Sequence, residues 1–284
     1  MLALSVTVIE VEGDSDDLDV PIKQCFDDIA FKKTVNLCSI NSVNIGRLLV
    51  QSVHFIYYYS RHLKAERSTG SRQPLLFVIP TGAGGHLAGG LLAMKMLGTF
   101  HSEPGTHNSS NIDARILCAS NANDIFCRLI QSGEFKPRRI VPTQAPAMDI
   151  DSFYNIERIL YWIVANETAG NLVAQWMNSL DVLKRFVLPE EYRLKLERAV
   201  QARSIPETDF LNTIRVVWEK HAYLVCPHSS IGVCAATAHL EQLKDSKGTR
   251  AIVCATAHAA KFTEALMKSL GQSKYAWNSL PNPT

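Results

Sequence analysis

The sequence predicts an α/β fold in which helices cover both faces of a mainly parallel sheet. Short apolar runs alternate along the chain with longer segments whose apolar residues recur at helical spacing. Small, hydroxylated or glycine residues follow several of the runs, as at the carboxyl ends of parallel strands. With 284 residues, 46% of them hydrophobic, the chain is long enough to bury an ordinary core.

The first 40 residues predict a strand, a helix and a second strand. Residues 5–11 (SVTVIEV) are rich in β-branched residues, which is typical of a strand. Apolar residues then recur at helical spacing over 18–29, and 35–40 (VNLCSI) is expected to form the second strand. No basic segment precedes the first run and acidic residues interrupt it, so we expect no signal peptide.

The next segments place a glycine-rich turn between a strand and a helix. A long helix is expected over 40–63, followed by a polar connector over 63–74 and a buried strand over 75–80 (LLFVIP). The turn PTGAGGHLAGG (80–90) leads directly into an apolar helix.

The remaining segments continue the alternation, with two interruptions. Residues 101–111 are expected to form a polar surface insertion, and residues 151–220 a largely helical subregion. A helix is expected to end at Gly133, where glycine suits a helix C-terminus. The remaining strands are expected at 114–120 (ARILCAS), 223–227 (YLVCP) and 251–255 (AIVCA).

Charge and cysteine usage exclude several partners. The formal net charge is +2, so no strong field exists to recruit nucleic acid or an anionic membrane, and no segment reaches 18 uninterrupted apolar residues. The seven cysteines are odd in number and form no C-x-x-C pair, which favours reduced thiols. We therefore expect a cytoplasmic or mitochondrial protein, with secretion by a route that needs no signal peptide left open.

The glycine turn misses both common nucleotide fingerprints. No Lys and Ser/Thr follow the glycines at P-loop spacing, and Leu87 stands where the third glycine of G-x-G-x-x-G belongs. What remains is a turn that presents several backbone N–H groups at a helix N-terminus, which suits a single phosphate monoester. The alternative is that the glycines serve close packing of helix on sheet.

Thr256 lies directly after the last expected strand and offers an uncharged hydroxyl to a heterocycle. The alternative for this residue is a turn or cap. Together with a phosphate cradle it outlines a cofactor such as pyridoxal phosphate. We interpret His228 and His258 as hydrogen-bonded, orienting residues.

Several motifs, in this order, resemble the carboxyl-terminal two thirds of the threonine synthase family, which comprises fold type II pyridoxal-phosphate enzymes. The resemblance runs from about Val6 to Leu270 and extends to the threonine synthase-like proteins of animals. The motifs are NLCSINSVNIGRLLVQ, PTGAGGHLAGGLLAMKMLG, SNANDIFCRLIQSGEF, TQAPAMDI with YNIERIL, CPHSSIGV and TAHAAKF.

The resemblance assigns roles to the cofactor residues. The cofactor phosphate is expected on the backbone of Gly82, Ala83, Gly84 and Gly85, and Thr256 is expected to face the pyridine nitrogen. The family often carries Asn-Phe where this chain has Ala83-Gly84, and an acid or amide at the position after the last of these glycines, where this chain has a histidine.

The substrate side rests on the NSVNIGR segment. By resemblance, Asn44 and Arg47 bind the substrate, and Arg47 is a natural bidentate partner for the phosphate of a small phosphorylated amino acid. The alternative is an arginine that is solvated or caps helix carbonyls. Other residues on family-like turns have structural roles as their alternative: Asn123, Asp124, Met148 and Asp149.

The resemblance also implies a missing part. Residues 1–30 would be a remnant of the smaller, cofactor-side subdomain, and residues 31–284 the large domain of the enzyme. The family's Schiff-base lysine lies upstream of every segment matched here, and neither Lys95 nor Lys261 matches its position. We therefore assign no catalytic residue, and expect pyridoxal 5'-phosphate to bind non-covalently at best.

Two functions follow as hypotheses. Intact relatives are expected to act as phospho-lyases that convert O-phosphohomoserine or O-phosphothreonine to 2-oxobutyrate, ammonia and phosphate, with this chain a truncated form that lacks activity alone. The alternative is a catalytically silent short isoform that acts by binding a partner or as a secreted signal. The sequence leaves the oligomeric state open.

Overall fold

The computed structural model describes residues 7, 9–12, 15–70, 73–100, 113–150, 153–243 and 248–271. These residues form two compact units, Met1–Ile40 and Asn41–Thr284. The expected polar insertion at 101–111 lies outside the described residues. The assignment of residues 1–30 to a smaller cofactor-side subdomain stays a prediction.

The first unit contains two short helices, α1 (Ser15–Asp27) and α2 (Ile29–Thr34). Asp28 caps α2 by accepting a hydrogen bond from the Phe31 N–H at 2.9 Å. The expected strand over 35–40 is wrong: these residues form a turn and an extended segment. A strand needs a neighbour with which to form a ladder, and no described strand pairs with this segment. Of the strand expected over 5–11, the described residues are not in a strand.

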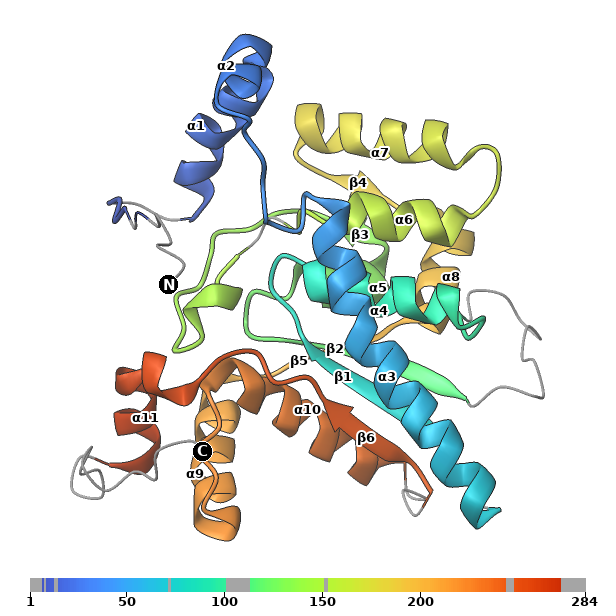
Figure 1. Cartoon of the computed structure of the whole chain (residues 1–284), viewed down its shortest axis with the longest axis vertical. Coiled ribbons are helices and arrows are strands. Elements are labelled where there is room, and N and C mark those ends of the chain that lie inside the picture. Colours follow the sequence, from blue (N-terminus) through green and yellow to red (C-terminus); the bar gives the residue numbers. More distant parts are fainter. Residues whose placement is uncertain are drawn as a thin grey trace. The chain divides into compact units, whose positions relative to one another are not determined.

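The second unit is built on a parallel sheet with the strand order β5-β2-β1-β6 (Figure 1). The central strands are β1 (Leu75–Pro80) and β2 (Ala114–Ser120), and β6 (Arg250–Val253) pairs with the other side of β1. Leu75 pairs with Ala114 on one side and with Arg250 on the other. The carboxyl ends of β1, β2 and β6 therefore lie at the same edge of the sheet.

Alternate residues of β1 face two different cores. Phe77 and Ile79 belong to the core formed with α3 (Ile45–Thr69) and α4 (Gly85–Met96), whereas Val78 belongs to a core formed with α9 (Glu207–His221) and α10 (Pro227–Gln242). Every residue of β1 is buried, as expected for a central parallel strand. Helices on both faces of a parallel sheet confirm the predicted fold class.

Helix α3 is longer than predicted. It begins after Asn44, whose side chain accepts the Gly46 N–H, and ends at Gly70 in the left-handed region (φ 69°). The predicted connector over 63–74 is therefore helical up to residue 69, because LKAER consists of strong helix formers.

The middle of the chain is helical, as expected, but it also contributes strands. Its helices are α5 (Ile125–Ser132), α6 (Ile156–Val164), α7 (Ala169–Leu183) and α8 (Glu190–Ala199). A short antiparallel ladder joins β3 (Glu134–Phe135) to β4 (Phe186–Val187), and β5 (Gln201–Ser204) extends the main sheet. A strand at β5 was not predicted because its polar sequence, QARS, is that of an edge strand.

The strand expected over 223–227 is wrong. Tyr223 to Cys226 form an extended segment that leads into α10, and both neighbours of β1 are other strands. The apolar run arises because Val225 and Cys226 are buried in a small core with α9. A 3-10 turn (Ala259–Lys261) and α11 (Thr263–Leu270) complete the described chain. Among the described residues, no helix is long and apolar enough to span a membrane.

Candidate functional site

The glycine turn joins β1 to α4 at the carboxyl edge of the sheet. Gly84 adopts the left-handed region (φ 80°), and a Cβ atom there would lie 2.2 Å from the Phe153 ring. A Cβ atom at Gly82 would lie 2.9 Å from the Ala147 carbonyl oxygen. Both glycines therefore allow Ala147 and Phe153 to approach the turn, and this packing shapes it. The alternative considered above, packing of helix on sheet, applies to Gly90, where a Cβ atom would lie 2.9 Å from the Ile79 side chain.

The same turn presents unpaired helix donors. The first N–H groups of any α-helix have no intrahelical acceptor, and in α4 the first bond back to the turn runs from the Ala88 N–H to the Gly84 carbonyl at 2.9 Å. Gly82, Ala83 and Gly85 line a cavity of about 220 Å³ at this helix end. The arrangement suits an anionic group of the size of a phosphate.

Asn155 holds the turn against the start of α3, and sequence reasoning missed it. Its side-chain N–H group, fully buried, donates to the Ser42 hydroxyl at 2.9 Å and to the Ala83 carbonyl at 3.0 Å. Arg158 donates to the Asn155 side-chain oxygen at 2.8 Å and to the Val43 carbonyl. The signal in the sequence is weak: a single Asn directly before an amphipathic helix, where a cap is the ordinary explanation.

A second, larger cavity of about 610 Å³ adjoins the first. The two share Arg47, Gln51, Pro80 and His86, and Thr256 lines the larger one. Its volume lies within the range of about 300 to 1,000 Å³ typical of small-molecule sites. The structure thus places the glycine turn and Thr256 in two neighbouring cavities, with Arg47 in the lining of both.

Thr256 lies in a cluster of small polar groups beyond the end of β6. Its N–H donates to the Ser229 hydroxyl at 2.9 Å, and its own hydroxyl lies 3.2 Å from that of Ser229 and 3.4 Å from the Cys226 sulfur. Cys226 is the N-cap of α10 and accepts the Ser229 N–H at 3.3 Å. Sequence reasoning missed the roles of Cys226 and Ser229, although Cys-Pro at a helix start was a usable signal.

The Cys226 thiol is unusually acidic. Burial by itself raises the pKa of Cys226, but the hydrogen bonds that it receives from His228, Ser229 and Thr256 outweigh burial and lower the pKa to about 6. His228 is buried and accepts the Ala147 N–H at 3.0 Å, and His258 accepts the Ala260 N–H at 3.2 Å. Both histidines thus make the orienting hydrogen bonds that we predicted for them.

His54 of α3 and His86 of α4 lie next to each other on the wall of the larger cavity. Their Nε2 atoms are 2.9 Å apart. Burial, followed by the positive charges of His54 and Arg47, lowers the pKa of His86 to about 4, and burial also lowers the pKa of His54. Both rings are uncharged at neutral pH.

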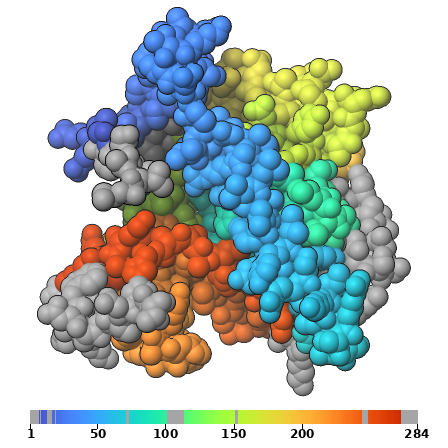
Figure 2. Space-filling view, in the orientation of Figure 1, coloured from blue at the N-terminus to red at the C-terminus, as the bar shows by residue number. Residues whose placement is uncertain are grey.

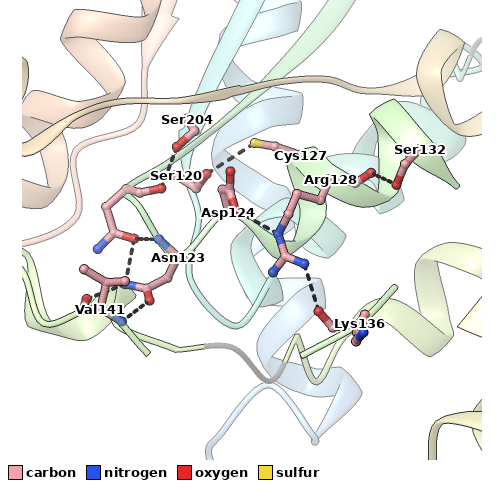
Figure 3. A network of polar contacts seen from close by, with 10 residues as sticks. Ser120, Asn123, Asp124, Cys127, Arg128, Ser132, Lys136, Val141 and Ser204 are labelled. Atoms are coloured by element: carbon pink, nitrogen blue, oxygen red, sulfur yellow. Dashed lines mark hydrogen bonds and ion pairs between the residues drawn. The ribbon is translucent and has the colours of Figure 1, made fainter. Parts of the chain in front are cut away.

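Other predicted residues have structural partners. Asn44 caps α3, and its predicted role in substrate binding stays a prediction. Asn123 exchanges two hydrogen bonds with the backbone of Val141, and Asp124 accepts from Arg128 at 2.9 Å (Figure 3). Asp149 accepts from Asn121, Asn123 and Thr143. These contacts fix the segment after β2 to the loop that carries Ala147.

The residues fit part of a pyridoxal 5'-phosphate site. The turn supplies phosphate donors, Thr256 supplies a neutral hydroxyl, and Gln51 carries a buried oxygen with no hydrogen-bond partner among the described residues. Neither cavity has a lysine among the described residues that line it. The fit therefore covers phosphate and ring but not the aldehyde.

Sequence comparison finds relatives over nearly the whole chain. The model of the family "Threonine synthase, C-terminal" matches residues 229–283. Threonine synthase-like 2 of Homo sapiens is 35% identical over 269 residues, which is 94% of this chain and 51% of that protein. Threonine synthase of Saccharomyces cerevisiae is 28% identical over 96% of this chain and 52% of that enzyme. The chain spans about half the length of the curated relatives it matches.

Crystal structures of related enzymes share the fold. Threonine synthase from yeast superposes with a TM-score of 0.78 at 26% identity, covering 95% of this chain and 52% of that one. Pyridoxal-phosphate-bound threonine synthase from Brucella melitensis gives 0.72 at 29% identity, covering 92% and 50%. The predicted resemblance and the fold type II architecture are confirmed.

Proposed function

The chain belongs to the threonine synthase family over about half of that family's length, and from this premise we propose that its paired cavities bind pyridoxal 5'-phosphate. The observation that carries the proposal is that the two cavities share four lining residues, with the glycine turn in one cavity and Thr256 in the other. The phosphate binds the N–H groups at the start of α4, and the ring lies toward Thr256. The relative from Brucella melitensis, whose structure holds this cofactor, supports the assignment.

The proposed substrate is a small phosphorylated amino acid. Arg47 lines both cavities and carries a planar cation suited to a phosphate. Bound pyridoxal phosphate supplies an electron sink for carbanions next to the amino group. The overall reaction consumes one water and converts O-phosphohomoserine or O-phosphothreonine to 2-oxobutyrate, ammonia and phosphate.

The residues that line the cavities allow cofactor binding to be considered separately from turnover of a substrate. Because no lysine lines either cavity among the described residues, an amine for covalent attachment must come from outside them. We propose that the chain alone binds the cofactor without turnover. If it is observed, binding without turnover will support the second function considered above, a catalytically silent product.

The test uses a probe that cannot react with surface lysines. 4'-Deoxypyridoxine 5'-phosphate keeps the ring and the phosphate but lacks the aldehyde, and its binding is measured by equilibrium dialysis. We expect the phosphorylated probe to bind at least about 10-fold more tightly than 4'-deoxypyridoxine, because hydrogen bonds to a charged group are worth about 1.5 to 3 kcal/mol. Inorganic phosphate should compete.

Two variants locate the binding. Gly82→Ala places a Cβ against the Ala147 carbonyl and should weaken the phosphorylated probe by about 10-fold or more, as one charged hydrogen bond is lost. Gly170→Ala is the matched control, because a Cβ there meets nothing within 4 Å. Equal affinities for the two probes, or equal losses in the two variants, would overturn the cofactor proposal. Release of phosphate from the substrate by the chain alone would contradict only the expectation that the chain binds the cofactor without turnover.

A further inference from the structure

Three metal-binding side chains converge on the wall of the larger cavity. They are His54 of α3, His86 of α4 and Cys254, which follows β6 directly. One ligand atom from each lies within 4.8 Å of the other two. From this juxtaposition we propose that His54, His86 and Cys254 form a site for a soft divalent transition metal such as Zn²⁺.

The ligand types fit such an ion. Imidazole nitrogen and thiolate sulfur are the preferred ligands of Zn²⁺, with bonds of about 2.0 to 2.1 Å and about 2.3 Å. Tetrahedral coordination at these bond lengths places the two nitrogens about 3.3 Å apart and each nitrogen about 3.6 Å from the sulfur. The Nε2 atoms of His54 and His86 are already 2.9 Å apart, so a small separation of the two rings and an approach of Cys254 complete the geometry.

The rings are presented from rigid elements. His54 also contacts the buried Phe55 in a tilted arrangement, with ring centroids 4.2 Å apart, and the His86 ring lies 5.3 Å from the same phenyl ring. The two helices pack in one core with β1, so the core holds the two histidine backbones near each other and only the side chains need to adjust. Cys254 is anchored by its N–H, which donates to the Val78 carbonyl at 2.9 Å.

The position of the site predicts an open coordination sphere. All three ligands line the larger cavity, which leaves the side of the ion that faces the cavity for water or a small ligand. Three protein ligands with one open position are the pattern of reactive rather than purely structural zinc sites. The alternative is a hydrogen-bonded histidine pair beside a thiol that binds no ion. The positive charge of Arg47, which acts on His86, favours that alternative.

The proposal does not depend on pyridoxal phosphate, and its test contains none. The full chain carries Cys25→Ser and Cys38→Ser to remove the two exposed thiols. After treatment with a chelator it is titrated with Co²⁺, followed by absorbance, and with Zn²⁺ in competition with a chromophoric chelator. We expect one ion per chain, with tetrahedral Co²⁺ bands and a thiolate-to-metal charge-transfer band.

Variants of each ligand decide between the two explanations. Cys254→Ser should abolish the charge-transfer band, and His54→Gln or His86→Gln should lower the affinity for Zn²⁺ by at least about 100-fold. The matched control combines Cys234→Ser and His239→Gln, a half-buried thiol and imidazole on α10 away from the cavity, and should change neither. Circular dichroism checks that each variant is folded. Should Cys254→Ser unfold, His54→Gln decides alone, because its side chain is only partly buried.

Two outcomes would overturn the site. One is that the chain with His54 intact binds Co²⁺ and Zn²⁺ no more tightly than the His54→Gln variant does. The other is Co²⁺ binding without a thiolate band, or with the same affinity in the ligand variants and the control, which would place the ion elsewhere on the chain.

Discussion

At the scale of single residues, Cys226 concentrates several weak interactions on one sulfur. Burial opposes a thiolate, but a buried imidazole, two hydroxyl groups and the first turn of α10 all favour one. The other buried thiols, Cys118, Cys127 and Cys254, have a pKa raised by burial. The lower pKa of Cys226 arises from the hydrogen-bond donors around its sulfur, not from greater exposure of the thiol.

We predict that Cys226 is a thiolate at neutral pH. Absorbance at the thiolate band, followed between pH 5 and pH 8, should rise through a midpoint near the pKa of about 6 and should not do so in Cys226→Ser. Identical titrations of the two proteins in this range would contradict the prediction.

The same shift predicts a pH dependence of stability. Folding lowers the pKa of Cys226 from 9.0 to about 6, so the unfolded chain binds more protons between these values. The stabilisation is fully present above pH 9 and is lost as pH falls toward 6. The difference in unfolding free energy between the wild type and Cys226→Ser, measured with urea, should therefore shrink from pH 9 to pH 6.

The sequence was informative about residues whose chemistry is local. The glycine turn and Thr256 could be found because each follows an apolar strand that was correctly placed. Asn155 and Ser229 could not, because their roles depend on partners more than 25 positions away, such as Ser42 and Thr256. Polar residues next to a helix start have many explanations, and only the fold selects one.

At the scale of elements, the turn from β1 to α4 shows what glycine contributes. Gly84 needs glycine twice, for its positive φ and for the approach of Phe153, whereas Gly70 at the end of α3 has a positive φ but open space around it. Gly170 in α7 has neither constraint. These three positions separate backbone strain from packing.

We predict a graded series of alanine substitutions. Gly170→Ala should leave stability unchanged or raise it by up to about 1 kcal/mol, because alanine favours helix. Gly70→Ala should cost about 1 to 2 kcal/mol through the left-handed backbone alone. Gly84→Ala adds about 1 to 3 kcal/mol of overpacking against Phe153 and should be the most destabilising. Urea unfolding measures the order, and equal losses at Gly84 and Gly70 would show that Phe153 moves aside freely.

Strands were predicted well where their sequence is an apolar run and poorly elsewhere. The three strands β1, β2 and β6 were found from apolar runs. The runs at 35–40 and 223–227 failed, since apolar residues in an extended segment do not by themselves supply a strand neighbour. The edge strand β5 was missed because its sequence, QARS, has no apolar run, whereas β6, the other edge strand, carries Ala-Ile-Val and was found.

At the scale of the whole molecule, the fold class could be predicted because alternation of strands and helices is a property of the entire chain. The strand order could not, since it depends on how crossovers are arranged in space. The structure also shows apolar residues of a long helix that are exposed. Figure 2 shows α3 uncovered on one face, and Leu49, Val50, Val53 and Tyr57 on this helix are exposed.

These α3 residues form a stripe at helical spacing, because positions 50, 53 and 57 lie on one side of the helix. Contiguous apolar surface of this kind usually marks an interface. We predict that the chain self-associates through the stripe, and that Val50→Glu with Val53→Glu lowers the apparent mass measured by light scattering across a range of concentrations.

The matched control is Val182→Glu with Leu183→Glu, an equally exposed apolar pair at the end of α7 that belongs to no such stripe. Both double variants add the same charge, and glutamate is favourable in a helix, so neither should unfold the chain. If the control lowers the apparent mass as much as the α3 variant, added charge is the cause and the stripe is not the interface. If only the α3 variant does so, the exposed face of α3 accounts for the association, because both variants replace two exposed aliphatic residues by glutamate.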